Sequence, residues 1–184
     1  GLGDVYKRQG MKQDDVENIF RSMTEYGRVM GLDGESMKGS LRAVEQMLNK
    51  GQIMSEELKL QLGERFPAAI SLMADAVSMD KYGERGKVTP AQLQDLMKKG
   101  LVKSDVLIEF SKILHEQAMA GGALAKAMQS TAAQQARFNN KFSDAVEIFA
   151  KAGFDEGMAS FFKGLADSID RATPLIQAFG RAFL

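Results

Sequence analysis

The spacing of apolar residues constrains the fold of this chain more than any other feature of its sequence. Apolar side chains recur at alternating steps of three and four residues, whereas the alternation with period two that β-strands need does not recur. An α-helix turns once every 3.6 residues, so such steps place the side chains on one face. The pattern predicts an all-α protein, with a compact multi-helix bundle of short helices followed by longer amphipathic helices. The clearest early examples are Val16, Phe20, Met23 and Gly27, and then Met37, Leu41, Val44 and Leu48.

Residues with capping chemistry predict where the first two helices begin and end. Asp15 is expected to cap the first helix, and Gly31 to end it. The second helix is expected to end at Lys50, directly before Gly51. A lysine in the last turn complements the helix dipole, and a glycine just past it adopts the left-handed conformation at little cost.

The next two helices are expected to be short. Ser55 is a predicted N-cap, and the carboxylates of Glu56 and Glu57 would face the positive end of the helix dipole. Gly63 ends this helix in the prediction. Pro67 suits the first position of a fourth helix, because the N–H that proline lacks would be unpaired there anyway.

A charged loop over residues 80–88 is predicted to lead into a fifth helix. Thr89 would cap it, Pro90 would follow at the first position, and Gly100 would end it. From Ser104 a longer helix is expected to run towards Gly121.

The segments 51–58 and 100–107 share one pattern. A glycine is followed, at identical offsets, by Ile or Val, by serine, by an acidic residue and by leucine. The physical unit would be a helix end, a buried apolar residue, a serine cap and the next helix. Either the chain repeats one helical corner, or connections between helices converge on this chemistry. The candidate structural motif, with its extension past residue 58, comprises Gly51, Ile53, Ser55, Glu56, Leu58, Leu62, Gly63, Pro67, Gly100, Val102, Ser104 and Leu107.

The C-terminal part of the chain carries a longer apolar seam. From residue 158 to residue 183 apolar residues alternate at steps of four and three, as in the seam of a coiled coil, and Pro174 does not shift the phase. Such a seam must be buried, either against residues 104–152 or against another chain, and pairing between chains is slightly favoured. The candidate interaction seam comprises Phe162, Leu165, Ile169, Ile176, Phe179 and Phe183.

No catalytic, cofactor or metal site is expected from the sequence. Cysteine is absent, and the chain has one histidine, His115, whose neighbours one helical turn away are not metal ligands. A structural, surface or half-buried role is therefore predicted for His115. The chain has 24 basic and 24 acidic residues, so it lacks the positive charge with which general nucleic-acid binders neutralise phosphates. No sequence-specific nucleic-acid partner is expected.

The sequence predicts no stable membrane span. Uncharged stretches such as residues 66–74 and 117–125 are much shorter than the roughly 18 residues that a spanning helix needs. Residues 4–9 (DVYKRQ) resemble the translation of a sequencing-library adaptor found at the ends of genes assembled from environmental DNA. Residues 1–10 are therefore interpreted as a non-native tail of a gene fragment.

One stretch carries a resemblance to a known family. Residues 47–69 resemble the N-terminal domain of tail tape measure proteins of tailed bacteriophages and prophages. The matching marks are the Lys-Gly pair at 50–51 before Ile53, the Ser-Glu-Glu-Leu run at 55–58, and the run at 61–67.

A second block, residues 89–102, also looks like this domain, so the resemblance covers about residues 35–115. Residues 81–87 depart from it, because they form a longer loop than the family usually has between its fourth and fifth helices. This departure affects where the fourth helix is expected to lie relative to the fifth.

The resemblance implies a structural role and no enzyme activity. A tape measure protein sets phage tail length, scaffolds polymerisation of the tail tube, and leaves the tail during DNA delivery. The expected partners are tail-tube, tail-tip or baseplate proteins and tail assembly chaperones, with self-association through helices as an addition. The expected location is the virion tail, and the host cytoplasm during assembly.

The expected domains are the tail 1–10, a tape-measure-like helical domain 11–120, and an amphipathic helical extension 121–184 that starts the rod. A different function class stays open beside this one. The chain could be a generic α-helical adaptor that docks a partner helix through the C-terminal seam.

Overall fold

The computed structural model describes residues 10–128 and Gly164. Within this part of the chain every regular element is helical, which confirms the predicted all-α bundle. The predicted seam residues from Phe162 to Phe183 lie outside the described residues. The elements are α2 (Gln13–Val29), α3 (Gly34–Lys50), η1 (Glu56–Leu62), α4 (Ala69–Tyr82), α5 (Pro90–Lys98), α6 (Val106–Met119), η2 (Ala120–Gly122) and α7 (Ala123–Met128).

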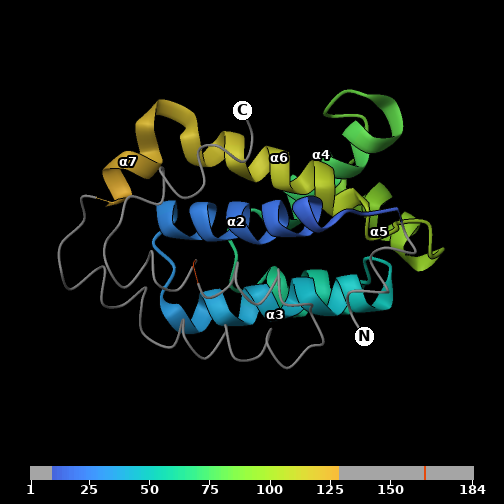
Figure 1. The fold of residues 1–184 in the computed structure, drawn as a ribbon. Helices are drawn as coiled ribbons and strands as arrows, with labels where there is room; N and C mark the ends of the chain where they lie inside the picture. The colour runs from blue at the N-terminus through green and yellow to red at the C-terminus, as the bar shows by residue number, and fades with distance from the viewer. Residues whose placement is uncertain (1–9, 129–163, 165–184) are drawn as a thin grey trace.

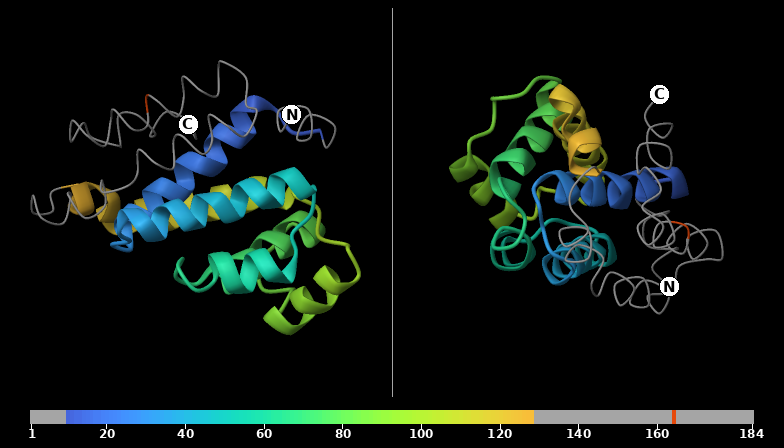
Figure 2. Two further views of the ribbon diagram at one scale, coloured as in Figure 1. Left: turned by 90° about the horizontal axis from the view of Figure 1, so that it is seen from below. Right: turned by 90° about the vertical axis from the view of Figure 1, so that its left-hand side faces the viewer.

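Helix α2 is the central element of the bundle. It lies between α3 and α6, and α7 packs against it as well (Figure 1). Helix α4 packs against α6, η1 lies against α3, and the short α5 lies at the end of the bundle beside α4 (Figure 2). The phenylalanines of three different segments, Phe20, Phe66 and Phe110, are fully buried and join these layers into one core.

The first helix begins earlier than its cap residue predicted. Lys12 is the N-cap of α2, and the Asp15 carboxylate accepts a hydrogen bond from the Lys12 N–H at 2.9 Å. The prediction that Asp15 is the N-cap is therefore wrong. An acidic side chain at the third helical position accepts a hydrogen bond from the N–H of the N-cap residue. In the sequence alone, such an acidic residue looks like an N-cap. The end at Gly31 is confirmed, since its φ is +73°.

Helix α3 ends where its sequence predicted, at Lys50 directly before Gly51. The Asp33 carboxylate accepts from the Ser36 N–H at 2.8 Å at one end, and Gly51 is left-handed, with φ +75°, at the other. The predicted apolar face is buried throughout, from Met37 to Leu48. Sequence rules work here because the helix is capped by its own residues at both ends.

The segment between α3 and α4 differs from its prediction. In η1 the turns are wide, and the Gly63 N–H donates to the Leu58 carbonyl five residues back at 2.7 Å. Helix α4 begins at Ala69, so the prediction that Pro67 is its first residue is wrong. Instead the Pro67 carbonyl accepts from the Tyr26 hydroxyl at 2.9 Å, and this long-range bond holds the turn before the helix.

The loop between α4 and α5 begins after Tyr82, because α4 continues to that residue, so the prediction that the loop starts at residue 80 is wrong. This loop is fixed from both sides. The Ser78 hydroxyl donates to the Glu84 carbonyl at 2.5 Å and accepts from the Lys87 N–H at 2.9 Å. Arg85 forms an ion pair with Glu116 of α6 at 2.5 Å. Helix α5 then begins as predicted, with Thr89 as N-cap in a reciprocal capping box and Pro90 in the first turn.

Candidate functional site

The two corners that share a sequence pattern lie against each other. The Ile53 N–H donates to the Val102 carbonyl at 2.8 Å, and the Ser104 N–H donates to the Gly51 carbonyl at 3.1 Å. These bonds form an isolated antiparallel bridge between Gln52 and Lys103. We call the two segments, residues 51–54 and 101–104, the paired corners.

The geometry of the paired corners follows from their sequences. Gly51 and Gly100 are both left-handed, with φ of +75° and +68°, so each ends a helix and turns the chain. Ile53 and Val102 then stand opposite each other, and each is 1% exposed. Because successive residues of an extended segment face opposite sides, the outer side carries Gln52 and Lys103.

The outer side of the paired corners is partly apolar. Met54 follows Ile53 in the first corner, and Leu101 precedes Val102 in the second. These side chains are 39% and 61% exposed, unlike the buried pair Ile53 and Val102 next to them. Exposed apolar side chains supply surface for protein contacts.

The serines of the motif do not act as the sequence predicted. Ser55 occupies the N-cap position of η1, but its side chain makes no capping bond; its hydroxyl accepts from the Gln94 Nε2 of α5 at 2.8 Å. At the second corner the N-cap residue of α6 is Asp105, one residue after the buried Ser104. Instead of capping η1, the Ser55 side chain forms a hydrogen bond that joins this segment to α5.

The two acids at the start of η1 have different surroundings. Glu56 is exposed, as expected for a dipole partner, but Glu57 is 1% exposed and forms an ion pair with Lys50. The hydrogen bond to Glu57 raises the pKa of the Lys50 ammonium. This pair joins the end of α3 to the start of η1 beside the first corner.

The remaining motif residues are core and turn residues. Leu58, Leu62 and Leu107 are fully buried. Gly63 is half-buried, with φ −61°, and a Cβ on it would lie 2.8 Å from the Lys59 carbonyl oxygen. The structure thus places most of the motif residues in or beside the paired corners and η1. Pro67 follows η1, and its carbonyl accepts the hydrogen bond from Tyr26.

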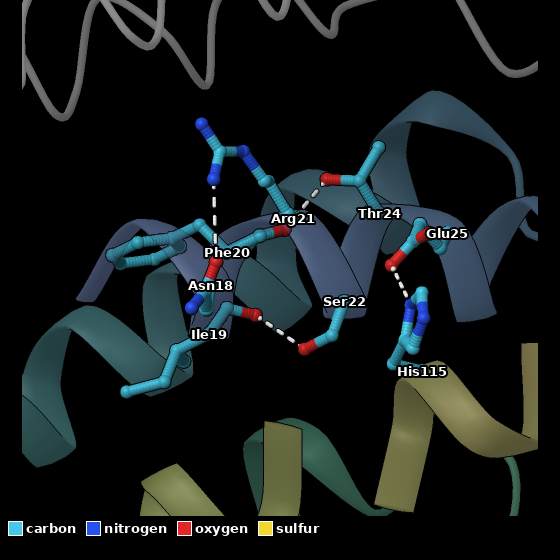
Figure 3. Close-up of polar contacts among 8 residues, drawn as sticks. All are labelled: Asn18, Ile19, Phe20, Arg21, Ser22, Thr24, Glu25 and His115. Atoms are coloured by element: carbon cyan, nitrogen blue, oxygen red, sulfur yellow. Dashed lines mark hydrogen bonds and ion pairs between the residues drawn. The ribbon is translucent and has the colours of Figure 1, made fainter. Parts of the chain in front are cut away.

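A buried acid–histidine contact joins α2 to α6. Glu25 is 0% exposed, and its Oε1 lies 3.0 Å from the Nδ1 of His115 (Figure 3). His115 is half-buried, as predicted. Burial raises the pKa of the Glu25 carboxyl, and the contact with His115 and the charge of Arg21 oppose that shift. Sequence reasoning missed Glu25, since the only local signal is an acid within an apolar helix face.

Two buried hydroxyl side chains of α2 form their hydrogen bonds within the helix. The Ser22 hydroxyl donates to the Ile19 carbonyl at 3.0 Å, and the Thr24 hydroxyl donates to the Phe20 carbonyl at 2.9 Å (Figure 3). Both side chains are buried. Backbone carbonyls therefore accept these hydroxyls without a partner helix.

No group of three or more side chains that could hold a metal ion occurs among the described residues. The contact of Glu25 with His115 belongs to no such group. In the same part of the chain, no helix is both long and apolar enough to cross a bilayer.

Comparisons with known proteins give the family of the chain. The sequence pattern of the family described as "Tape measure protein" matches residues 1–151. The "Probable tape measure protein" of Salmonella phage Felix O1 (isolate Felix O1-VT1) is 29% identical over 165 residues, which are 89% of this chain. The chain spans 19% of the length of that relative. No solved structure matches the chain. The match across most of its length shows that the chain belongs to the tape measure protein family, whose members are structural proteins of phage tails.

Proposed function

We propose that the described bundle is a terminal module through which a phage tape measure protein contacts other tail proteins. The observation that carries this proposal is the family match over residues 1–151, which includes the whole bundle described here. The bundle is compact, and backbone hydrogen bonds join its paired corners. Such a structure suits a rigid contact module better than an extended ruler.

The proposed roles of the whole protein are to set tail length, to scaffold polymerisation of the tail tube, and to leave the tail during DNA delivery. An α-helix rises about 1.5 Å per residue, so a helical rod converts residue number into length. The chain covers about a fifth of the Salmonella phage relative, and the greater part of such a rod would lie in other segments. The segment after residue 120 is proposed as the start of that rod.

The proposed partners are tail-tube, tail-tip or baseplate proteins and tail assembly chaperones. Support comes from exposed apolar side chains of the bundle, because such side chains can mark contact surfaces. Met54 and Leu101, one in each of the paired corners, are both exposed. The proposed locations are the virion tail and, during assembly, the host cytoplasm.

Co-expression tests this proposal. The chain would be produced with each protein encoded by the neighbouring tail genes, and complexes would be separated by size-exclusion chromatography with light scattering. At least one tail-tube, tail-tip or chaperone protein should co-elute with the chain. The double variant M54S/L101S should weaken that complex if the outer side of the corners contributes, while M30S, at another exposed methionine (45% exposed), is the matched control.

Co-elution with none of these proteins would overturn the proposed function. Equal weakening by M30S and by the corner variant would leave the function standing and remove the corners from the contact surface.

A further inference from the structure

The loop between α4 and α5 encloses an open pocket that the proposed function does not use. Its volume is about 360 Å³, near the small end of the range for ligand sites, about 300–1,000 Å³. The end of α4, the end of the loop and the first turns of α5 supply its walls. A site of this size admits a few side chains of a peptide, and is too small for a large cofactor.

The walls of this pocket are held in place before any ligand arrives. Ser78 binds the loop at two backbone positions, and the Arg85–Glu116 ion pair ties it to α6. Val88, one of the lining residues, is 6% exposed and anchors the end of the loop in the core. A preformed site loses less entropy on binding than one that must order its loop first.

The charged residues in the lining of the pocket are two lysines and one aspartate. Lys81 and Lys87 contribute two ammonium groups. The Nζ of Lys81 lies 5.6 Å from the ring centroid of Tyr82, and among the described residues no carboxylate lies within ion-pair distance of it. The one acidic lining residue, Asp95, already pairs with Lys99 at 2.9 Å.

The existing ion pairs around the pocket do not prevent an anion from binding. Lys87 Nζ lies 3.3 Å from the Glu84 carboxylate, but these side chains are 55% and 62% exposed. Exposed pairs of this kind contribute little, about 0–1 kcal/mol, so an incoming carboxylate can compete for the ammonium. The N-terminal turn of α5, which also lines the pocket, adds the positive end of a helix dipole.

The apolar lining of the pocket completes the recognition chemistry. The lining also includes the apolar residues Val88, Ala91 and Leu96, together with Tyr82, which is 54% exposed. We infer that this pocket binds an acidic peptide segment of a partner protein, with an aspartate or glutamate at the lysines and a neighbouring apolar side chain against these residues. The inference rests on the proposed function, because it expects a protein partner in the tail.

The test uses the full chain and a defined probe. The peptide acetyl-Asp-Leu-Glu-Leu-amide would be titrated into the labelled chain while amide resonances are followed by NMR. Its uncharged isostere, acetyl-Asn-Leu-Gln-Leu-amide, is the control for charge. The acidic peptide should shift the amides of Ala91, Gln92 and Asp95, and its affinity should fall as ionic strength rises from about 50 to about 300 mM.

Substitutions at the lysines separate this site from general surface charge. K81M and K87M should each weaken binding about threefold, and the double variant about tenfold, since each exposed pair contributes modestly. K98M removes an exposed lysine of α5 outside the pocket, and should leave the affinity unchanged.

Three results would overturn the inference. They are equal binding of the uncharged peptide, equal weakening by K98M, and tighter binding of a single-stranded oligonucleotide than of the peptide at the same amides. If the chain co-elutes with a tail protein but does not bind the peptide, only the inference about the pocket is refuted. A chain that binds the peptide but none of the tail proteins would refute only the proposed function.

Discussion

Glu25 of α2 and His115 of α6 are 90 positions apart in sequence, and their side chains meet at 3.0 Å between Oε1 and Nδ1 inside the bundle. The other carboxylate oxygen of Glu25 is buried without a hydrogen-bond partner in the described residues. The contact therefore makes the packing of α2 on α6 sensitive to protonation.

The first prediction concerns pH. In the folded state the pKa of the Glu25 carboxyl is raised above its ordinary value of 4.5. The stability that this carboxyl contributes is therefore complete below about pH 4.5, and it is lost as the pH rises through the folded-state pKa. Compared with E25Q, the wild type should lose stability from about pH 4.5 towards neutral, by at most about 1.4 kcal/mol per pH unit. Urea unfolding across this range measures the difference, and E64Q controls for loss of a carboxylate at an exposed position. A difference that stays constant or grows with pH would contradict the role of Glu25.

The second prediction concerns the first corner. Gly51 has φ +75°, where a β-branched residue is strained, so G51V should destabilise the bundle by about 2 kcal/mol or more. G51N should cost less, because asparagine tolerates the left-handed region. Thermal unfolding compares the two variants. An unchanged melting temperature for G51V would show that the glycine conformation is not required.

The third prediction compares two glycines that have ordinary φ values. A Cβ on Gly63 would lie 2.8 Å and 2.9 Å from the carbonyl oxygens of Lys59 and Leu58, which are backbone atoms. G63A should therefore cost about 1–3 kcal/mol. At Gly39 the nearest atoms belong to the exposed side chain of Arg65, which can move, so G39A should be neutral or stabilising by up to about 1 kcal/mol. Equal effects in urea titration would refute the close approach at Gly63.

The fourth prediction concerns the bond between Ser55 and Gln94. S55A should cost about 1 kcal/mol, because it removes the acceptor of a half-buried hydrogen bond. The double variant S55A/Q94A should cost less than the sum of the two single variants, as expected for partners in one bond. If Ser55 acted as a helix cap instead, the effects would add, and a double-mutant cycle from urea unfolding distinguishes the two cases.

The elements governed by local chemistry could be predicted from the sequence. The end of α3 and the start of α5 follow from the local chemistry of Gly51 and Thr89. The predictions failed where a distant residue decides the structure, as at Pro67, whose carbonyl binds Tyr26, and at Ser55, whose hydroxyl binds Gln94.

The difference between local chemistry and long-range contacts also explains how much of the candidate site could be predicted. The repeat of the glycine corners was visible in the sequence, but nothing in it indicated that the two copies pair through a bridge. The contact of Glu25 with His115 was out of reach, because only the packing of α2 on α6 brings the residues together.

Tail length in the phage that carries this gene tests most directly whether the bundle is a contact module at the end of a molecular ruler. Electron microscopy would compare an in-frame deletion of about 60 residues from the segments proposed to form the rod with a deletion of residues 11–128. The first should shorten tails by about 90 Å, at about 1.5 Å per residue, and the second should abolish tails of defined length. Tails of normal length from either deletion would contradict this function.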